Sequence, residues 1–304
     1  MTIEVKSHME NGVRTYEAEI NGEKIHWDDA LTYSMHLRTH QLLSAQVPVS
    51  DQPDEMLFII IHQTMELWIK LCLHEAKIAV GLIQRDQLDK AFKTLDRMAA
   101  ILRHMIHSWE ILATLTPHDF LTFRGYLRKG SGFQSYQYRE LEFTLGNKNE
   151  DLIVVHRDDK PVYDQLLKVL NTPSIYDETL MLLDKRGFAI PASALNRDWA
   201  QPYEPHPDIE KAWHTIYSDV DAHWDLYMLG EKLTALEYYF QEWRFKHMKT
   251  VSRVIGNKRG TGGSSGVSYL VKALDLSFFP ELWSMRTDMV APVMGPTGRY
   301  QTPA

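Results

Sequence analysis

Two histidines lie on the apolar sides of two long helical patterns, where a titratable ring is unusual. His62 falls within DEMLFIIIHQTMELWIKL, residues 54–71, on the face that carries Phe58. His247 fills one slot of the apolar stripe that runs over about 231–255. A lone histidine of this kind is more often a hydrogen-bonded core residue than a ligand. Two of them on separate helices can instead hold a haem iron from one side and contact a bound gas or substrate on the other. Spacing alone leaves open which ring binds iron, and whether a haem is present.

Other motifs for metal or phosphate chemistry are incomplete. His74-Glu75 lacks the second histidine of a zincin, and no pair of Glu-x-x-His motifs supports a di-iron site. The segment GNKRGTGGSSG, residues 256–266, follows a helical pattern and not a strand, so it matches neither a Walker loop nor a dinucleotide fingerprint. The backbone N–H groups before the apolar VSYLVKAL pattern offer an anion site. A capped turn explains the same residues equally well.

The composition narrows the class of protein. The chain has 304 residues and a formal net charge of −7, which argues against a nucleic-acid partner because phosphate binding needs a basic surplus. Cys72 is the single cysteine, so no disulfide forms within the chain and a reducing compartment is expected. The N-terminus is polar from its first residues, so we expect no signal peptide. No uninterrupted apolar run of 18 residues occurs, so we expect no membrane span. We therefore expect a cytoplasmic protein.

Helical periodicity covers most of the chain and predicts an all-α fold in one domain. The best strand candidate is DLIVVH, residues 151–156. The proline- and glycine-punctuated stretches at 187–207 and 256–266 interrupt helices without resembling flexible linkers. Further helical patterns cover roughly 86–113, 135–146, 160–171, 174–186 and 207–229.

Several long stretches resemble the tryptophan 2,3-dioxygenase family. They are DEMLFIIIHQTMELWIKL, FRGYLRKGSGFQSYQYRELEF and WRFKHMKTVSRVIGNKRGTGGSSGVSYL, and LTYSMHLRTHQLLSAQ resembles the opening helix of that family. The likeness covers nearly the whole chain in the same order. It implies an all-α homotetramer with one haem b per subunit. It also implies that both atoms of O2 enter the indole C2–C3 bond of L-tryptophan to give N-formyl-L-kynurenine, the first step of the kynurenine pathway.

The resemblance also implies roles for individual residues. His247, in RFKHMK, matches the proximal iron ligand, and His62, in IIIHQT, matches the catalytic histidine that accepts a hydrogen bond from the indole N–H. Phe58 would pack against the indole plane. Arg124, in TFRGYL, matches the guanidinium that holds the substrate carboxylate in a two-pronged contact. Thr261, in RGTGGSSG, matches a hydroxyl that helps to hold the amino-acid end.

Further positions match the substrate pocket less directly. Ser131 and Gly132, in GSGFQS, resemble the segment that lines the distal side, and Tyr33, in LTYSMH, matches a tyrosine that reaches the site from a neighbouring subunit. His36 and Phe120 stand where some relatives carry tyrosines. We expect these two departures to alter affinity without altering the reaction.

The resemblance suggests three parts within the single domain 1–304. Residues 1–45 form a helical intersubunit segment, residues 54–275 form the haem- and substrate-binding core, and residues 276–304 form a C-terminal tail. Two alternatives remain open: a helical haem-based gas or ligand sensor without turnover would not need Arg124 and Thr261, and a cofactor-free helical scaffold would be colourless.

Overall fold

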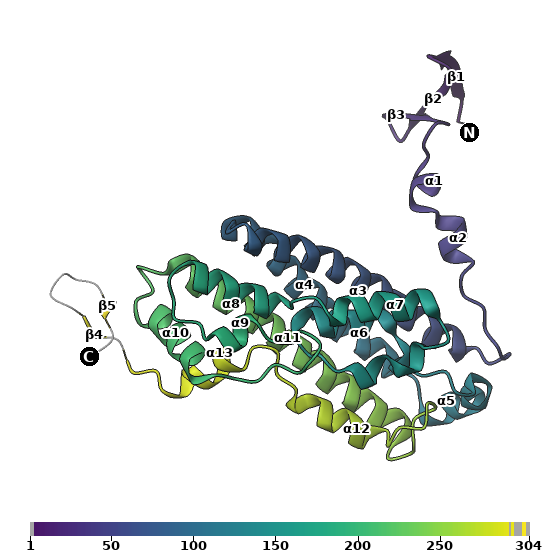
Figure 1. Ribbon diagram of the computed structural model, residues 1–304. Coiled ribbons are helices and arrows are strands. Elements are labelled where there is room, and N and C mark those ends of the chain that lie inside the picture. The colour runs from purple at the N-terminus through teal and green to yellow at the C-terminus, as the bar shows by residue number, and fades with distance from the viewer. Residues whose placement is uncertain (1–2, 292, 295–299, 302–304) are drawn as a thin grey trace. The chain divides into compact units, whose positions relative to one another are not determined.

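The computed structural model describes residues 3–291, 293–294 and 300–301, and the chain divides into two compact units, Met1–Val49 and Ser50–Ala304 (Figure 1). The larger unit is built from helices, which confirms the all-α prediction. The partition into 1–45, 54–275 and 276–304 remains a prediction. Its last segment falls in part on residues 292, 295–299 and 302–304, which lie outside the described residues.

The N-terminal unit begins with a small sheet, so the prediction of a helical segment over 1–45 was wrong for its first part. Strands β1 (Val5–Glu10), β2 (Val13–Ile20) and β3 (Glu23–Asp28) form an antiparallel meander. Each turn is an Asn-Gly pair with positive φ at both residues, 49° and 81° at Asn11-Gly12 and 53° and 84° at Asn21-Gly22. This pair is typical of tight hairpins because both residues tolerate left-handed backbone. Two short helices follow, α1 (Tyr33–Leu37) and α2 (Thr39–Leu43).

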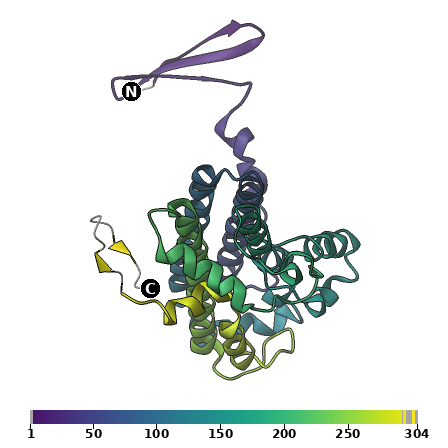
Figure 2. The same ribbon diagram turned by 60° about the vertical axis from the view of Figure 1, so that its left-hand side comes forward.

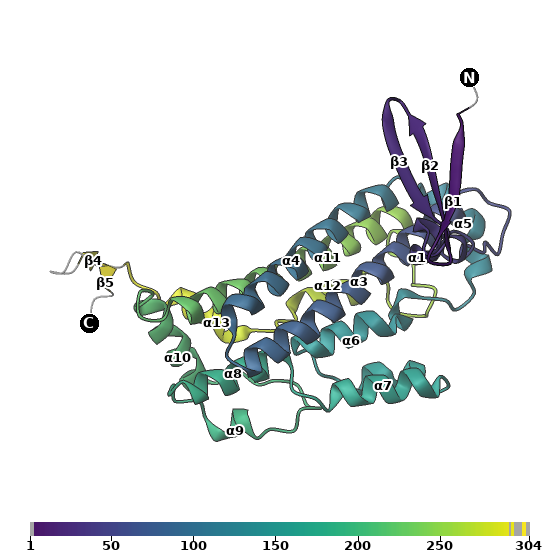
Figure 3. The ribbon, with the colours of Figure 1, turned by 90° about the horizontal axis from the view of Figure 1, so that it is seen from above.

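The larger unit is organised by three long helices. Helix α4 packs along both α3 and α11, and the three lie side by side in Figures 2 and 3. Their bounds are α3 Asp54–Gln84, α4 Leu88–Leu112 and α11 Trp224–Ile255. The buried positions of α4 recur at three- and four-residue spacing, among them Ala91, Leu95, Met98, Leu102, Met105 and Trp109.

Shorter elements surround this core. The α-helices are α5 Pro117–Arg124, α6 Tyr136–Leu145, α7 Lys160–Leu170, α8 Ile175–Lys185, α9 Ala192–Leu195, α10 Pro207–Ser218, α12 Val267–Lys272 and α13 Pro280–Ser284. The 3-10 helices are η1 Gly125–Leu127, η2 Gly132–Gln134, η3 Glu150–His156, η4 Ala273–Asp275 and η5 Met285–Thr287. The two-residue strands β4 (Val293–Met294) and β5 (Tyr300–Gln301) pair near the C-terminus.

Two predicted elements were wrong. The strand expected at 151–156 is 3-10 helix η3, which begins where the Asn149 side chain accepts the N–H of Asp151 at 2.9 Å. The helix expected over 207–229 breaks between α10 and α11, where the Asp219 carboxylate accepts the N–H of Ala222 at 3.1 Å. In both cases a polar side chain offers the backbone an alternative partner that apolar periodicity does not reveal.

Helix α3 also corrects the expectation that no segment suits a membrane span. By length and composition it is long and apolar enough, with a mean hydropathy of 1.5 over its best 18-residue window. A core helix passes the same test, and α3 buries Ile61, Met65 and Ile69 among its neighbours.

Candidate haem and substrate site

A cavity of about 510 Å³ lies between α3 and α11 and is bordered by α4, α5, α6 and the glycine-rich loop before α12. The folded chain brings together at this cavity side chains from segments far apart in the sequence. All of the predicted site residues of the larger unit line it: Phe58, His62, Phe120, Arg124, Ser131, Gly132, His247 and Thr261. Tyr33 and His36 lie on α1 in the N-terminal unit.

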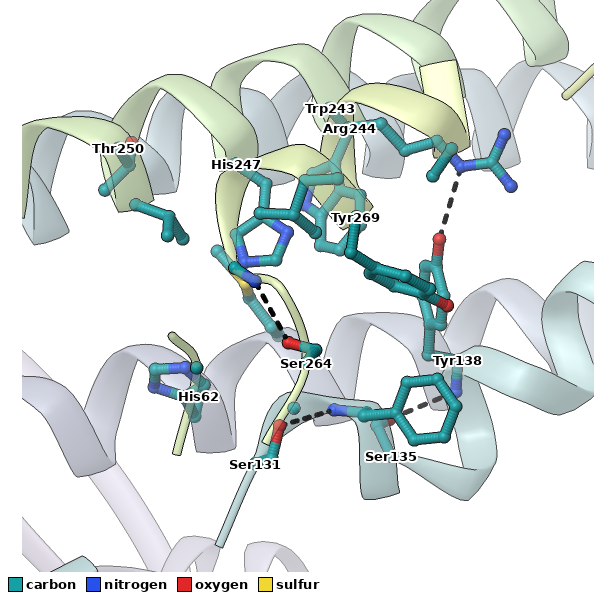
Figure 4. Close-up of a pocket in the computed structure, with 18 of the residues that line it drawn as sticks. His62, Ser131, Ser135, Tyr138, Trp243, Arg244, His247, Thr250, Ser264 and Tyr269 are labelled. Atoms are coloured by element: carbon teal, nitrogen blue, oxygen red, sulfur yellow. Dashed lines mark hydrogen bonds between the residues drawn. The ribbon is translucent and has the colours of Figure 1, made fainter. Parts of the chain in front are cut away.

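The two histidines enter the cavity from opposite sides, His62 from α3 and His247 from α11 (Figure 4). Both histidines are partly buried. Burial lowers the pKa of His62, although the Phe58 carbonyl and Glu66 oppose that effect. Burial, with a smaller effect of His62, lowers the pKa of His247 to about 4. Both imidazoles are therefore neutral near pH 7.

The backbone fixes the tautomer of His62. Its Nδ1 lies 2.7 Å from the carbonyl oxygen of Phe58, one turn earlier on α3. Since a carbonyl can only accept, Nδ1 carries the proton and donates it. Nε2 of the neutral ring is then left with a lone pair. His62 is thus prepared to accept a hydrogen bond from a donor in the cavity.

Aromatic side chains form the wall beside His62. The ring centroids of Phe58 and Phe120 are 5.8 Å apart, and both rings contact Phe123, at 5.7 and 5.3 Å. Phe58 also lies 4.2 Å from the His62 ring. This wall is suited to a flat apolar group, and the ring of His62 lies beside it.

The glycine-rich loop closes against the segment that follows α5. The Thr261 hydroxyl donates to the Gly130 carbonyl at 2.5 Å, and an Arg124 Nη2 donates to the Arg259 carbonyl. A Cβ on Gly262 would lie 2.8 Å from Cβ of Ser131, so the approach needs glycine there. The Ser131 hydroxyl in turn accepts the Phe133 N–H at 3.3 Å.

The N–H groups of Gly260, Gly263 and Gly266 are engaged within the glycine-rich loop itself. The Gly260 N–H donates to the Ser264 carbonyl at 3.2 Å, and the Gly263 N–H donates to the Gly260 carbonyl at 3.0 Å. The Ser264 hydroxyl accepts from the Gly266 N–H (Figure 4). These three N–H groups are therefore occupied, whereas helix α12 itself begins after Gly266 without a side-chain cap. Arg124 and Thr261 remain the groups that can bind the amino-acid end of a ligand. Each donates to a backbone carbonyl, and a ligand can replace that carbonyl as the hydrogen-bond partner.

Charged residues that the sequence analysis missed line the far end of the cavity. Glu142 on α6 accepts from Arg139 and from Arg244, the latter at 2.6 Å, and Arg244 also contacts the Tyr138 hydroxyl (Figure 4). Arg139, Glu142 and Arg244 are all buried. Charges on helical patterns ordinarily indicate a solvated face, so apolar periodicity gave no sign of this buried cluster.

The cavity has groups that suit the two parts of a haem that contact protein most specifically, the iron and the carboxylates. His247 presents a neutral ring to an apolar space, as iron ligation requires. At the charged end, two guanidinium groups face one carboxylate. The Arg139 Nε and Asn147 Nδ2 donors are buried there with no hydrogen-bond partner among the described residues. Unpaired buried donors beside surplus positive charge suit the carboxylates at a haem edge.

Comparisons with known proteins agree on one family. A family model described as tryptophan 2,3-dioxygenase matches residues 18–215 and 214–289. A relative from Bordetella pertussis (strain Tohama I) is 48% identical over 275 residues, which cover 90% of this chain and 97% of the relative. One from Shewanella woodyi is 51% identical over 269 residues, covering 88% and 94%. One from Bacillus thuringiensis subsp. konkukian is 49% identical over 275 residues, covering 90% and 99%. All three are named tryptophan 2,3-dioxygenase.

Proposed function

The chain belongs to the tryptophan 2,3-dioxygenase family and is therefore an oxidoreductase of that type, and we propose that it binds haem b and converts L-tryptophan to N-formyl-L-kynurenine. Both atoms of O2 enter the indole C2–C3 bond. The proposal further places this reaction at the start of the kynurenine pathway, in the cytoplasm. The observation that carries it is the pair of neutral imidazoles facing one cavity from opposite sides, with Arg124 at its rim.

In this proposal His247 holds the haem iron, and Arg139 with Asn147 provides donors for the haem carboxylates. When bound, ferrous haem supplies the redox centre for O2, while the indole supplies the electrons, so that no external reductant is consumed in each turnover. The chain itself binds and orients the substrate and excludes water.

The proposed substrate contacts come from groups on the side of the cavity opposite His247. Nε2 of His62 accepts the indole N–H, and Phe58 packs on the indole plane. Arg124 and Thr261 exchange their carbonyl partners for the carboxylate and ammonium of the substrate. Ser131, Gly132 and Phe120 complete the wall. Holding both ends of the substrate fixes the C2–C3 bond in one position.

The decisive experiment mixes reduced protein, L-tryptophan and 18O-labelled O2 and follows product absorbance and mass. We expect N-formylkynurenine that carries both labelled atoms. A coloured protein that binds tryptophan without forming product would instead support the sensor alternative. A colourless protein that takes up no added haem would support the scaffold alternative.

His62→Ala is expected to keep its haem and lose part of its rate. The lost contact is one hydrogen bond to a neutral donor, worth on the order of 1 kcal/mol, so the rate should fall roughly five- to tenfold. 1-Methyltryptophan, which cannot donate that bond, should react with the variant nearly as well as tryptophan does. Steady-state kinetics with both substrates provides the test. Loss of haem from this variant would mean that the two histidines have been assigned to the wrong sides.

We further propose that the enzyme is a homotetramer in which Tyr33 completes the pocket of a neighbouring subunit. The Tyr33 side chain is 78% exposed within its own chain, and α1 buries none of its residues. Burial against a second copy would explain an aromatic residue in that position.

Co-expression of Tyr33→Ala and His247→Ala chains should restore activity that neither parent has. If Tyr33 acts in a neighbouring pocket, random pairing leaves roughly one pocket in four with both groups intact. The assay compares mixed assemblies with each parent and with separately purified parents combined at assay. If mixing restores nothing at any ratio, Tyr33 acts within its own chain, while the dioxygenase assignment remains.

A further inference from the structure

The ring of His247 has a stacking partner but no hydrogen-bond partner in the part of the chain that the structure describes. Neither ring nitrogen has a hydrogen-bond partner among the described residues, whereas the Trp109 indole lies flat against the ring, with centroids 4.6 Å apart and planes 13° apart (Figure 4 shows the His247 ring). Metal-bound histidines ordinarily donate their second ring N–H to a carboxylate or carbonyl, which fixes the ring orientation. In this chain the flat face of Trp109 is the contact available to do so.

Trp109 is itself fixed in place. Its side chain is 3% exposed on α4, the helix that packs along α11. Trp243, one turn before His247 on α11, lies 5.3 Å from Trp109 and 5.6 Å from the His247 ring. Trp243 in turn contacts Tyr138 at 5.4 Å. Packed rings from α4 and α6, together with Trp243 of α11 itself, therefore surround the imidazole.

We propose that Trp109 is a positioning residue that fixes the ring plane of His247 by stacking, in place of the usual hydrogen bond to a ligand histidine. The inference rests on the proposed role of His247 as the iron ligand. In this proposal the flat face of Trp109 restrains rotation of the His247 imidazole about its side-chain bonds. A ring held in this way would keep a nitrogen directed into the cavity for a haem iron, and with no carboxylate partner among the described residues it would donate less electron density to that iron.

The alternative is that Trp109 only fills space in the core. Trp213 provides the matched control because it is an indole on α10 that is fully buried, contacts Tyr176 and Tyr217, and does not line the cavity. Replacing either tryptophan by leucine removes the same side-chain volume. Only the Trp109 substitution removes the stack.

The first experiment compares holoprotein carrying Trp109→Leu, Trp109→Phe, Trp213→Leu or no substitution. The ferrous iron–histidine stretching line is recorded by resonance Raman, and haem release is timed by transfer to apomyoglobin. Trp109→Leu should broaden and shift the line and release haem about tenfold faster, the upper end of what one stacked aromatic pair contributes. Trp109→Phe retains a flat ring, so it should stay within about threefold of wild type. Trp213→Leu should lower the melting temperature and leave the line unchanged.

Each outcome has one meaning. If Trp109→Leu gives the line and release rate of Trp213→Leu, Trp109 is a core residue and the inference is overturned. If phenylalanine and leucine at position 109 shift the line and speed haem release alike, a flat ring does not preserve the wild-type behaviour, which also overturns the inference. A wild-type protein with no iron–histidine line would contradict the ligand assignment itself, so failure of the proposed function is distinguishable.

A second experiment covers the case in which Trp109→Leu does not fold. His247→Gly protein is given haem together with increasing imidazole, which should occupy the place of the missing ring, and the dissociation constant of imidazole is measured from the haem spectrum. Adding Trp109→Phe should change that constant by less than threefold, and adding Trp109→Met, which fills more of the vacated volume than leucine but has no flat ring, should weaken it about tenfold. Equal constants for the phenylalanine and methionine double variants would overturn the proposal.

Discussion

His247→Ala protein is expected to purify almost without haem while retaining its helices. His247 is the only residue proposed to bond iron, and loss of an outer partner alone typically costs a metal site ten- to a hundredfold in affinity. Removal of the ligand itself should then cost at least about a hundredfold. The ratio of Soret to protein absorbance measures occupancy, and far-ultraviolet circular dichroism measures helix content. His107→Ala is the matched control, since His107 lies on α4 with a side chain that is 74% exposed.

The same variant distinguishes the two histidines. His62 is proposed to contact substrate, so His62→Ala should keep its haem under conditions in which His247→Ala loses it. Full haem occupancy and activity in His247→Ala would overturn the ligand assignment. The reverse pattern of haem loss would exchange the roles of the two rings and leave the cavity and the family membership unchanged.

Arg124→Leu is expected to weaken tryptophan binding by roughly 2 to 5 kcal/mol, the cost of leaving a charged partner unpaired. That loss is on the order of thirtyfold to several thousandfold in the dissociation constant. Arg124→Lys should recover only part of it, because an ammonium cannot reproduce a two-pronged guanidinium contact. Substrate titrations of the haem spectrum give the constants directly.

Tryptamine separates substrate recognition from loop support. Arg124 also donates to the Arg259 carbonyl, so its removal disturbs the glycine-rich loop as well. Tryptamine lacks the carboxylate and should lose far less affinity than tryptophan on going from wild type to Arg124→Leu. Equal losses for both compounds would assign Arg124 a structural role. Arg128→Leu controls for the loss of a nearby exposed arginine.

The sequence by itself determined the helical class and the two histidine positions. Apolar spacing of 3.6 residues placed His62 and His247 on inward faces of α3 and α11, and long motifs in order predicted the family. It also contained the Asn-Gly pairs at 11–12 and 21–22, whose hairpin signal was overlooked in favour of a helical segment.

Local polar contacts determined two elements of secondary structure that apolar periodicity predicted wrongly. Asn149 and Asp219 each offer a side-chain oxygen to the backbone, which gives a 3-10 helix where a strand was predicted and a break where a helix was predicted. Such contacts depend on one atom pair and leave no period in the sequence. The buried cluster of Arg139, Glu142 and Arg244 was missed for a related reason, because charges are buried only where a partner from another element meets them.

Only the tertiary structure decided how the site is assembled. The packing of α4 between α3 and α11 sets His62 and His247 across one cavity, and it lays Trp109 against the His247 ring. The Phe58 carbonyl determines which nitrogen of His62 can accept a hydrogen bond. These contacts connect atoms on different helices or, for His62 and Phe58, residues one turn apart on the same helix. A sequence pattern gives the face on which a side chain lies, whereas the distance to its partner is set when the helices pack.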